Sequence, residues 1–267
     1  MAKTRLDALL YRRGLFESRA RAAAAVKEGR VKVGGIVMTK AGAFVEGDCE
    51  VEVTQTEDYA SRGALKLEKA LDTFNISPQG RVCIDCGAST GGFTDCLLRR
   101  GAQKVYAVDV GFGQLIERLR TDSRVVVMER TNVRDLTPAD VPDKPSLAVI
   151  DVSFISLRLV LPPVRALLDE GGEAICLIKP QFEAGRENVG KKGIVKSRAV
   201  HEKVLRRWMD DACGAGFSVA GLTYSPITGS NGNIEFLGYL TTKEADGLPI
   251  RPEEVVSAAH AALATAP

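Results

Sequence analysis

Three glycines lie within six positions of the segment DCGASTGGFTD, which occupies residues 85–95. A short apolar run, RVCI, precedes the segment, and a helical stretch beginning CLLRRG follows it. A glycine-rich turn between a strand and a helix lets the backbone approach a bound ligand closely. The sequence therefore predicts a cofactor site at this turn.

The spacing of the glycines narrows the choice of cofactor. Gly87, Gly91 and Gly92 form the pattern G-x-x-x-G-G, which differs from the G-x-G-x-x-G of dinucleotide-binding turns, and no Lys follows as in a phosphate-binding loop. Asp85 adds a carboxylate that would repel a pyrophosphate but attract the ammonium and sulfonium groups of S-adenosylmethionine. S-adenosylmethionine is therefore the predicted cofactor.

A second acidic residue, Asp109, ends the apolar run KVYAVDV. A carboxylate at this position accepts hydrogen bonds from both ribose hydroxyls of a cofactor, but NAD-binding enzymes use the same device, so Asp109 alone does not discriminate. The adenine edge is expected at the segment after the third strand. The predicted cofactor-binding residues are Asp85, Gly87, Ala88, Ser89, Gly91, Gly92, Phe93, Asp109, Asn132 and Val133.

Strand-like apolar runs alternate with helical stretches from Arg81 onward. The runs are RVCIDCG, KVYAVDV, RVVVMER, SLAVIDV, EAICLIK, FSVAGLTYS and NIEFLGYL. This alternation is typical of an α/β fold with a mostly parallel sheet, here of seven strands, and helices on both faces. Such sheets bind ligands beyond the carboxyl ends of their strands. We assign this domain to residues 61–242 and expect the functional residues at those strand ends.

The first 45 residues differ in charge from the rest of the chain. They hold 10 Lys and Arg against 3 Asp and Glu, whereas the whole chain has a net charge of only +2. Apolar residues recur at helical spacing in two short stretches, one around Leu9 and one ending at Val26. VKVGGIVMTK then predicts a hairpin, and CEVEV a closing strand. We expect a small basic α+β module over residues 1–53 and a polar linker over 54–60.

The segment RLDALLYRRGLFESRARAAAAVKEGRVKVGG, with the strands that follow it, resembles the S4 RNA-binding domain. In that family a helix pair carries basic side chains to an RNA backbone, a contact that does not read sequence. Solvation of a helix face is the alternative for any single arginine, but their concentration favours a polyanionic partner. The predicted RNA contacts of this module are Arg5, Arg12, Arg13, Arg19, Arg21, Lys27 and Arg30.

The fourth and fifth strands end in residues that bear on the reaction. Asp151 follows SLAVI, and Lys179 follows EAICLI. The fourth strand lacks the proline–proline–aromatic turn typical of methylation at a base nitrogen, and no cysteine is placed to attack a pyrimidine carbon. Lys66, in SRGALKLEKAL, and Glu235, in NIEFLGYL, complete a Lys–Asp–Lys–Glu series.

This series resembles the catalytic tetrad of the FtsJ/RrmJ-like RNA 2'-O-ribose methyltransferases, and with the S4 module in front the pattern resembles the TlyA family, sometimes labelled hemolysin A. The resemblance covers residues 3–240 and includes SRGALKL, DCGASTGGFTD, DVGFGQL, ERTNVRDL, DVSFISL, KPQFEAG and GNIEF. It implies an S4 domain followed by a Rossmann-like class I methyltransferase domain. It also implies ribosomal RNA as the substrate, within ribosomal subunits and at a cytidine, which nothing in the spacing shows.

A ribose hydroxyl is a poor nucleophile, so in-line attack on a sulfonium methyl needs a base and a charge that stabilises the developing alkoxide. Lys179 is the candidate for either role. Lys66 would favour its neutral form, whereas Asp151 and Glu235 would favour its charged form, and the sequence leaves that balance open. Each residue alone also fits a surface charge, a helix cap or an ion pair. The argument for a site is their joint placement.

The segment PQFEAGRENVGKKGIVKSR combines glycines with basic residues. It predicts a flexible lid that offers charge to RNA phosphates, with an ordinary solvated loop as the alternative. Lys191, Lys192 and Arg62 complete the predicted RNA contacts. Phe154 and Phe182 fit core packing better than stacking on a base.

The composition, 45% hydrophobic and 26% charged, is that of a soluble protein. No window approaches the ~18 apolar residues of a membrane span, and the N-terminus lacks the features of a signal peptide, so a cytoplasmic location is expected. The six cysteines are scattered. Cys83 and Cys86 would point to opposite faces of a strand, so we expect reduced thiols and no metal site.

Two other functions are weighed against the methyltransferase. A membrane-lytic toxin, as the hemolysin label suggests, conflicts with the absence of a signal, a membrane span and a basic amphipathic helix with bulky apolar residues. A noncatalytic RNA-binding protein on a methyltransferase scaffold conflicts with the intact Lys–Asp–Lys–Glu series. The tail, residues 243–267, is expected to hold a short helix that opens at Pro252 and lies outside the region of resemblance.

Overall fold

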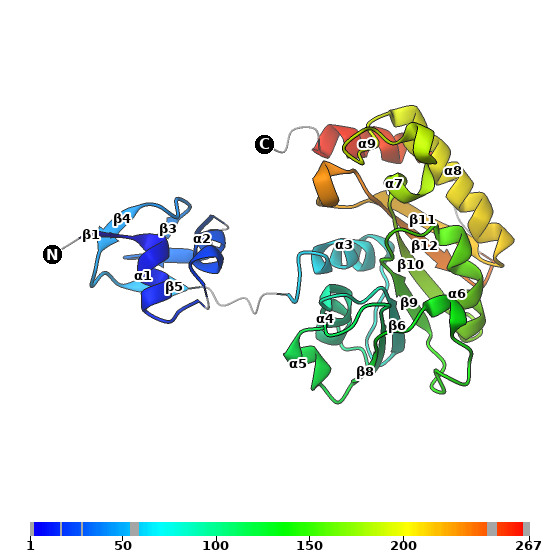
Figure 1. Ribbon diagram of the computed structural model, residues 1–267, viewed down its shortest axis with the longest axis horizontal. Helices are drawn as coiled ribbons and strands as arrows, with labels where there is room; N and C mark the ends of the chain where they lie inside the picture. Colours follow the sequence, from blue (N-terminus) through cyan, green and yellow to red (C-terminus); the bar gives the residue numbers. More distant parts are fainter. Residues whose placement is uncertain (1–2, 17, 28, 54–58, 245–249, 264–267) are drawn as a thin grey trace. The chain divides into compact units, whose positions relative to one another are not determined.

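The computed structural model describes residues 3–16, 18–27, 29–53, 59–244 and 250–263. The chain forms two compact units, Met1–Asp58 and Tyr59–Pro267 (Figure 1). The predicted linker, 54–60, falls mostly outside the described residues. Its last two residues, Tyr59 and Ala60, pack against the larger unit, so that unit begins earlier than the sequence suggests.

The smaller unit contains two helices and five short strands. These are β1 (Lys3–Arg5), α1 (Leu6–Arg12), α2 (Arg19–Lys27), β2 (Val31–Val33), β3 (Ile36–Met38), β4 (Phe44–Glu46) and β5 (Val51–Val53). Strand β2 pairs antiparallel with β3 and β5, as the predicted hairpin and closing strand require. The turn between β2 and β3 is made by Gly34 and Gly35, both at positive φ. The β1–β4 pair was not predicted.

Asp7 is the polar centre of this small unit. It is 5% exposed, and its carboxylate accepts hydrogen bonds from Arg5 Nη2 at 2.9 Å, from Arg19 Nη2 at 3.3 Å and from Ala8 N at 2.8 Å. The hydrogen bond from Arg5 is the main reason that the pKa of Asp7 falls from 3.8 to about 2. Two of the arginines expected to contact RNA therefore also stabilise the fold.

The larger unit is built on a seven-stranded sheet, as predicted. Its strands are β6 (Val82–Cys86), β7 (Lys104–Val108), β8 (Val125–Met128), β9 (Leu147–Ile150), β10 (Glu173–Ile178), β11 (Ser218–Tyr224) and β12 (Phe236–Thr241). Their order in the sheet is β11-β12-β10-β9-β6-β7-β8. Of the seven strands, β12 runs opposite in direction to the other six, so the sheet is mostly parallel.

Helices cover both faces of this sheet (Figure 1). One face packs against α3 (Ala64–Phe74), α4 (Gly92–Arg99) and α5 (Glu117–Arg120). The other packs against α6 (Leu161–Leu167), α8 (Arg198–Gly214) and α9 (Pro252–Leu263). Cys83 lies in the first of these two cores and Cys86 in the second, which confirms that they face opposite sides of β6.

The sheet order places a switch point between β6 and β9. The chain proceeds from β6 outward to β7 and β8 and then returns to β9, on the other side of β6. Crevices at such points, beyond the carboxyl ends of the strands, are where α/β sheets bind ligands. The glycine turn after β6 and Asp151 after β9 meet at this point.

The C-terminal helix α9 is part of the larger unit rather than a separate tail. Val256 and Ala259 are fully buried in the core that α9 shares with α8. His260 Nε2 lies 3.0 Å from Nδ1 of the buried His201 on α8. No helix within the described residues is both long and apolar enough to cross a membrane.

Replacement of Asp7 by Asn should destabilise the smaller unit by about 1–2 kcal/mol, because the two arginines lose a charged acceptor. Hydrogen exchange of the α1 and α2 amides measures this loss, and the exposed Asp48→Asn is the matched control. Because the pKa of Asp7 is depressed, its contribution is present above pH about 4 and is lost as the pH falls toward 2. Equal exchange in the two variants would show that Asp7 is not a structural acceptor.

Candidate active site

Gly87 brings the turn after β6 against the end of β9. Its φ is +94°, and a Cβ atom at this position would lie 2.6 Å from the carbonyl oxygen of Asp151. Gly91 allows the side chains of Leu115 and Leu119, in and near α5, to pack closely against the turn. Gly92 allows the same for the side chain of Ser61. All three glycines therefore allow the turn to pack tightly within the protein, a role the sequence interpretation did not assign to them.

A cavity of about 110 Å³ lies at this turn. The predicted cofactor residues in its lining are Gly87, Ala88, Ser89, Gly92 and Phe93. Asp151 also lines it, with three residues that the sequence did not single out: Ser61, Gly63 and Thr90. No Lys or Arg is among the lining residues, so the cavity suits a cationic or neutral group better than a phosphate.

Two carboxylates flank the turn, as predicted. Asp85 is fully buried and accepts a hydrogen bond from Thr94 Oγ1 at 2.7 Å, while its Oδ1 has no hydrogen-bond partner among the described residues. Burial raises the pKa of Asp85 to about 7, and the charges of Asp151 and Asp109 add to that rise. Asp109 accepts hydrogen bonds from Ser89 N at 2.8 Å and Gly111 N at 2.7 Å, so it ties the ends of β6 and β7 together.

The remaining predicted cofactor residues form the start of the short helix η1 (Val133–Asp135). Asn132 caps this helix by accepting a hydrogen bond from Arg134 N at 3.1 Å, and Val133 is 7% exposed. Neither residue lines the cavity described above. Their contact with a cofactor stays a prediction.

Lys66 and Glu235 form an ion pair at the carboxyl edge of the sheet. Lys66 Nζ, on the first turn of α3, lies 2.6 Å from Glu235 Oε2, just before β12. The side chains are 11% and 3% exposed. The pair joins residues 169 positions apart and holds α3 against the strand ends.

Lys179 and Asp151 form the second ion pair. Lys179 Nζ lies 2.5 Å from Asp151 Oδ1 and donates hydrogen bonds to Val152 O at 2.9 Å and Ser153 Oγ at 2.8 Å. Two hydrogen bonds and one ion pair therefore fix the Lys179 side chain at the junction of β9 and β10.

The two pairs interact with each other. Burial raises the pKa of Glu235, and the positive charges of Lys66 and Lys179 oppose that rise while the charge of Asp151 adds to it. All four groups therefore lie within electrostatic range of one carboxylate. These contacts bring together the four side chains that the sequence predicted to meet: Lys66, Asp151, Lys179 and Glu235.

Comparisons with known proteins agree with this arrangement. The family model described as FtsJ-like methyltransferase matches residues 59–241, and the S4 domain model matches residues 4–51. The 16S/23S rRNA (cytidine-2'-O)-methyltransferase TlyA of Mycobacterium tuberculosis is 40% identical, over 99% of each chain. Hemolysin A of Brachyspira hyodysenteriae is 43% identical, over 88% of this chain and 98% of its own.

A solved structure from Streptococcus thermophilus that bears a hemolysin name has a TM-score of 0.75 and 47% identity, over 99% of this chain and 98% of its own. The chain belongs to the TlyA family of FtsJ-like methyltransferases. Because these matches span nearly the whole chain, the family similarity includes α9, which the sequence interpretation had left outside it.

In this TlyA-family protein the basic loop after β10 is anchored rather than free. Asn233, 2% exposed, accepts a hydrogen bond from Val195 N at 3.0 Å and donates one to Gly193 O at 2.9 Å. Val195 O in turn contacts His201 Nε2 at 3.1 Å. Asn233 was not singled out from the sequence, although its position two residues before Glu235 could have indicated a role near the tetrad.

Phe154 lies on the surface beside this tetrad. It is 91% exposed, has φ +63° and lies 5.0 Å from the ring of Phe182, which is partly buried. The interpretation of Phe154 as a core residue is wrong, because the positive φ turns the segment after Asp151 outward. Glu183 supports this turn by accepting hydrogen bonds from Ser156 Oγ and Leu157 N at 2.7 and 2.8 Å.

The residues predicted to contact RNA lie mostly at the surface of their units. Arg30 is partly buried, whereas the other nine are exposed: Arg5, Arg12, Arg13, Arg19, Arg21, Lys27, Arg62, Lys191 and Lys192. Arg12 donates a hydrogen bond to Thr4 Oγ1 and Arg13 donates one to Gly47 O, and both remain exposed. Contact with RNA stays a prediction for all ten.

Replacement of Gly87 by Ala should destabilise the larger unit by about 2–4 kcal/mol, because the methyl group would meet Asp151 O and the positive φ would be strained. Gly80→Ala is the matched control, since Gly80 also has a positive φ but no atom within 4 Å of its Cβ position. It should cost only about 1 kcal/mol. Denaturant unfolding followed by the fluorescence of Trp208, the single tryptophan, measures both.

Proposed function

We propose that this protein transfers the methyl group of S-adenosylmethionine to the 2'-hydroxyl of a cytidine in ribosomal RNA. The observation that supports this most directly is the pairing of Lys66 with Glu235 and of Lys179 with Asp151 beside the glycine-turn cavity. The relatives named for cytidine-2'-O methylation of rRNA support the substrate. A substrate of this kind would place the protein in the cytoplasm.

The residues around the glycine turn fit S-adenosylmethionine. Asp85 Oδ1 is a buried acceptor without a partner among the described residues, which suits the ammonium of the cofactor. Asp109 keeps unused lone pairs for ribose hydroxyls, because each oxygen accepts one backbone N–H. When bound, S-adenosylmethionine supplies an electrophilic methyl group on a sulfonium.

The tetrad can activate and orient the ribose. Lys179, positioned by Asp151, Val152 and Ser153, would offer positive charge where the 2'-oxygen becomes an alkoxide. The 2'-oxygen would bond to the methyl carbon as the bond from that carbon to the cofactor sulfur breaks, and the hydroxyl proton would pass to a carboxylate oxygen of Asp151 beside Lys179. Lys66 and Glu235 fix the other side of the site and exclude water from it.

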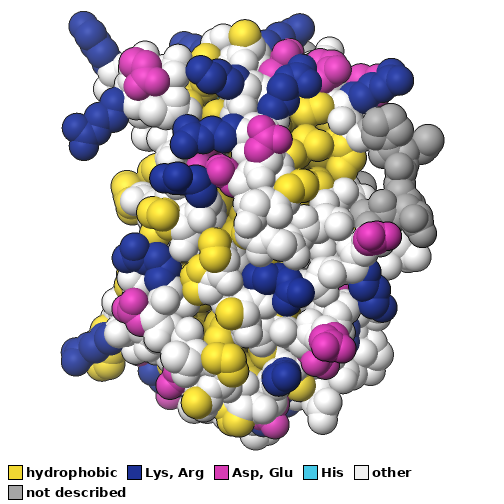
Figure 2. All heavy atoms as spheres, turned by 90° about the vertical axis from the view of Figure 1, so that its right-hand side faces the viewer, with side chains coloured by type: hydrophobic (Ala, Val, Ile, Leu, Met, Phe, Trp, Pro, Cys, Tyr) yellow, Lys and Arg dark blue, Asp and Glu magenta, His cyan; other side chains and the backbone are white. Residues whose placement is uncertain are grey.

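Several surface features support RNA as the polymer that binds. The exposed ring of Phe154 beside Lys179 can stack on an unpaired base, which is how proteins commonly hold single-stranded RNA. By contrast, Lys and Arg on the face with α6 and α8 are spread among Asp and Glu (Figure 2). On that face Arg206 pairs with Glu253 and Arg207 with Asp211. RNA is therefore expected at the strand-end edge rather than at this face.

Incubation of the protein with labelled S-adenosylmethionine and ribosomal subunits, followed by mapping of 2'-O-methyl nucleotides, tests the proposal. Lys179→Ala should reduce methyl transfer by about 1,000-fold or more while cofactor affinity changes little, because the alkoxide loses its cation. Lys203→Ala removes an exposed lysine of α8 as the control. Substantial activity of Lys179→Ala would remove this residue from its role, and lysis of liposomes without methylation would favour the hemolysin reading.

Cofactor affinity should rise by up to about 10-fold between pH 6 and pH 8, because Asp85 has a pKa of about 7 and only its ionised form attracts the ammonium. Asp85→Asn should flatten this rise. Comparison of the two proteins by calorimetry cancels the titration of the cofactor itself. Identical pH profiles would show that Asp85 does not contact the cofactor.

A further inference from the structure

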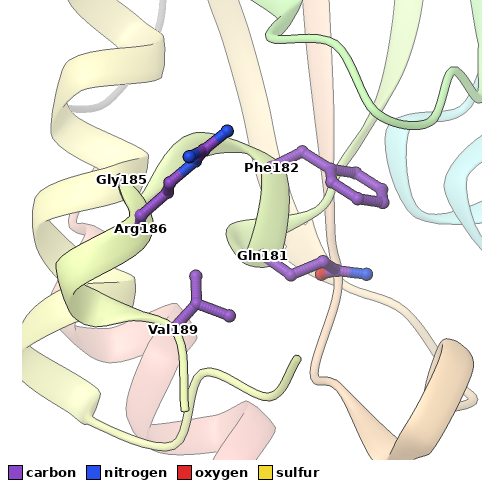
Figure 3. Close-up of a pocket in the computed structure, with 5 residues that line it drawn as sticks. All are labelled: Gln181, Phe182, Gly185, Arg186 and Val189. Atoms are coloured by element: carbon purple, nitrogen blue, oxygen red, sulfur yellow. The ribbon is translucent and has the colours of Figure 1, made fainter. Parts of the chain in front are cut away.

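A second cavity lies beside the short helix α7 (Pro180–Glu183) and has a volume of about 350 Å³. It is lined by Gln181, Phe182, Gly185, Arg186 and Val189, and we call it the α7 pocket (Figure 3). It shares no lining residue with the cavity at the glycine turn. Its volume is in the range of sites that bind small organic groups, roughly 300–1,000 Å³.

The lining of the α7 pocket combines three kinds of contact. The Phe182 ring and the Gln181 carboxamide project in the same direction from α7, and Arg186 extends from the following turn (Figure 3). Gln181 Oε1 is buried and has no hydrogen-bond partner within the part of the chain that the structure describes. Arg186 is exposed and forms no ion pair with any described residue. An aromatic ring, an amide and a guanidinium together match a base, its polar edge and its phosphate.

The α7 pocket lies next to the reaction centre. Gln181 and Phe182 lie two and three residues after Lys179 in the chain, and the centre of the Phe182 ring is 6.0 Å from Lys179 Nζ. This distance corresponds to one or two steps of about 3.4 Å along a nucleic-acid strand. A nucleotide in the pocket would therefore be a near neighbour of a ribose at Lys179. The ring of Phe154, which does not line the pocket, lies 5.0 Å from the ring of Phe182.

The far wall of the α7 pocket is held in place by hydrogen bonds. The chain returns from Val189 through a turn closed by Gly190 N to Ile194 O at 3.1 Å, and Asn233 fastens the following residues to the segment before Glu235. The carboxylate beside the pocket, Glu187, accepts a hydrogen bond from Asn188 Nδ2 at 3.1 Å. The pocket is thus shaped before any ligand arrives, which lowers the cost of binding.

We propose that the α7 pocket binds the base of a nucleotide that flanks the methylated one in the RNA chain. Phe182 stacks on this base, the Gln181 carboxamide pairs with its polar edge, and Arg186 contacts its phosphate. The inference rests on the proposed function, and it adds a second point of base recognition beside the tetrad. The phosphate contacts predicted for the smaller unit do not read sequence, so recognition of a base must come from the larger unit.

The test first maps the methylated nucleotide and then changes the two nucleotides on either side of it, one at a time, in rRNA assembled into subunits. At one flanking position the change should lower kcat/KM of the unaltered protein on the order of 10-fold. Gln181→Leu should lose a similar factor on unchanged rRNA and become nearly indifferent to that position. Lys203→Gln, the control, should behave as the unaltered protein does, and cofactor affinity should be equal in all three.

A second readout does not depend on methylation. Ribosomal RNA that contains 4-thiouridine should crosslink on irradiation to the peptide that carries Phe182 and Arg186, and Arg186→Gln should weaken the crosslink. The inference would be overturned if Gln181→Leu lowered kcat/KM by the same factor on every altered rRNA. It would also be overturned if the variant changed the preference for the methylated nucleotide itself. If the protein methylates no rRNA, the proposed function fails, and absence of the crosslink would then overturn the pocket assignment as well.

Discussion

The approach of Gly87 to the backbone of Asp151 is the contact on which the rest of the site depends. It sets the distance between the ends of β6 and β9, and with it the distance between the glycine turn and Asp151. Any side chain at position 87 would force these strand ends apart. Lys179 is positioned through Asp151, and both affect the pKa of Glu235, so the missing Cβ atom at position 87 also influences where these charged side chains meet.

The two ion pairs serve geometry more than stability. Removing two charges from water costs several kcal/mol for each, and their mutual attraction offsets that cost only when hydrogen bonds satisfy the remaining groups. Lys179 meets this condition through Val152 and Ser153, whereas the carboxylate of Glu235 has Lys66 as its close partner and a raised pKa. A nonpolar pair would hold α3 against β12 at less cost. The presence of four charged groups at this edge is therefore better explained by the proposed catalytic role than by stability.

The sequence predicts those parts of the structure that local pattern determines. Seven apolar runs gave the strands of the larger unit, and the type and spacing of the tetrad residues gave their place at the strand ends. The packing roles of Gly91 and Gly92, the hydrogen bonds of Asn233 and the burial of α9 arise from segments far apart in the chain. Phe154 was misread because its exposure follows from a positive φ, which an aromatic residue rarely adopts.

A division of labour between the two units follows from their charges. Apart from the partly buried Arg30, the arginines of the smaller unit are exposed and form an array of positive charge, in which Asp7 orients Arg5 and Arg19. Such an array attracts any phosphate backbone and cannot select a nucleotide. Selection requires contact with a base, and the aromatic and amide groups near Lys179 lie on the segments that follow β9 and β10. The proposed function therefore assigns affinity for RNA and choice of nucleotide to different units.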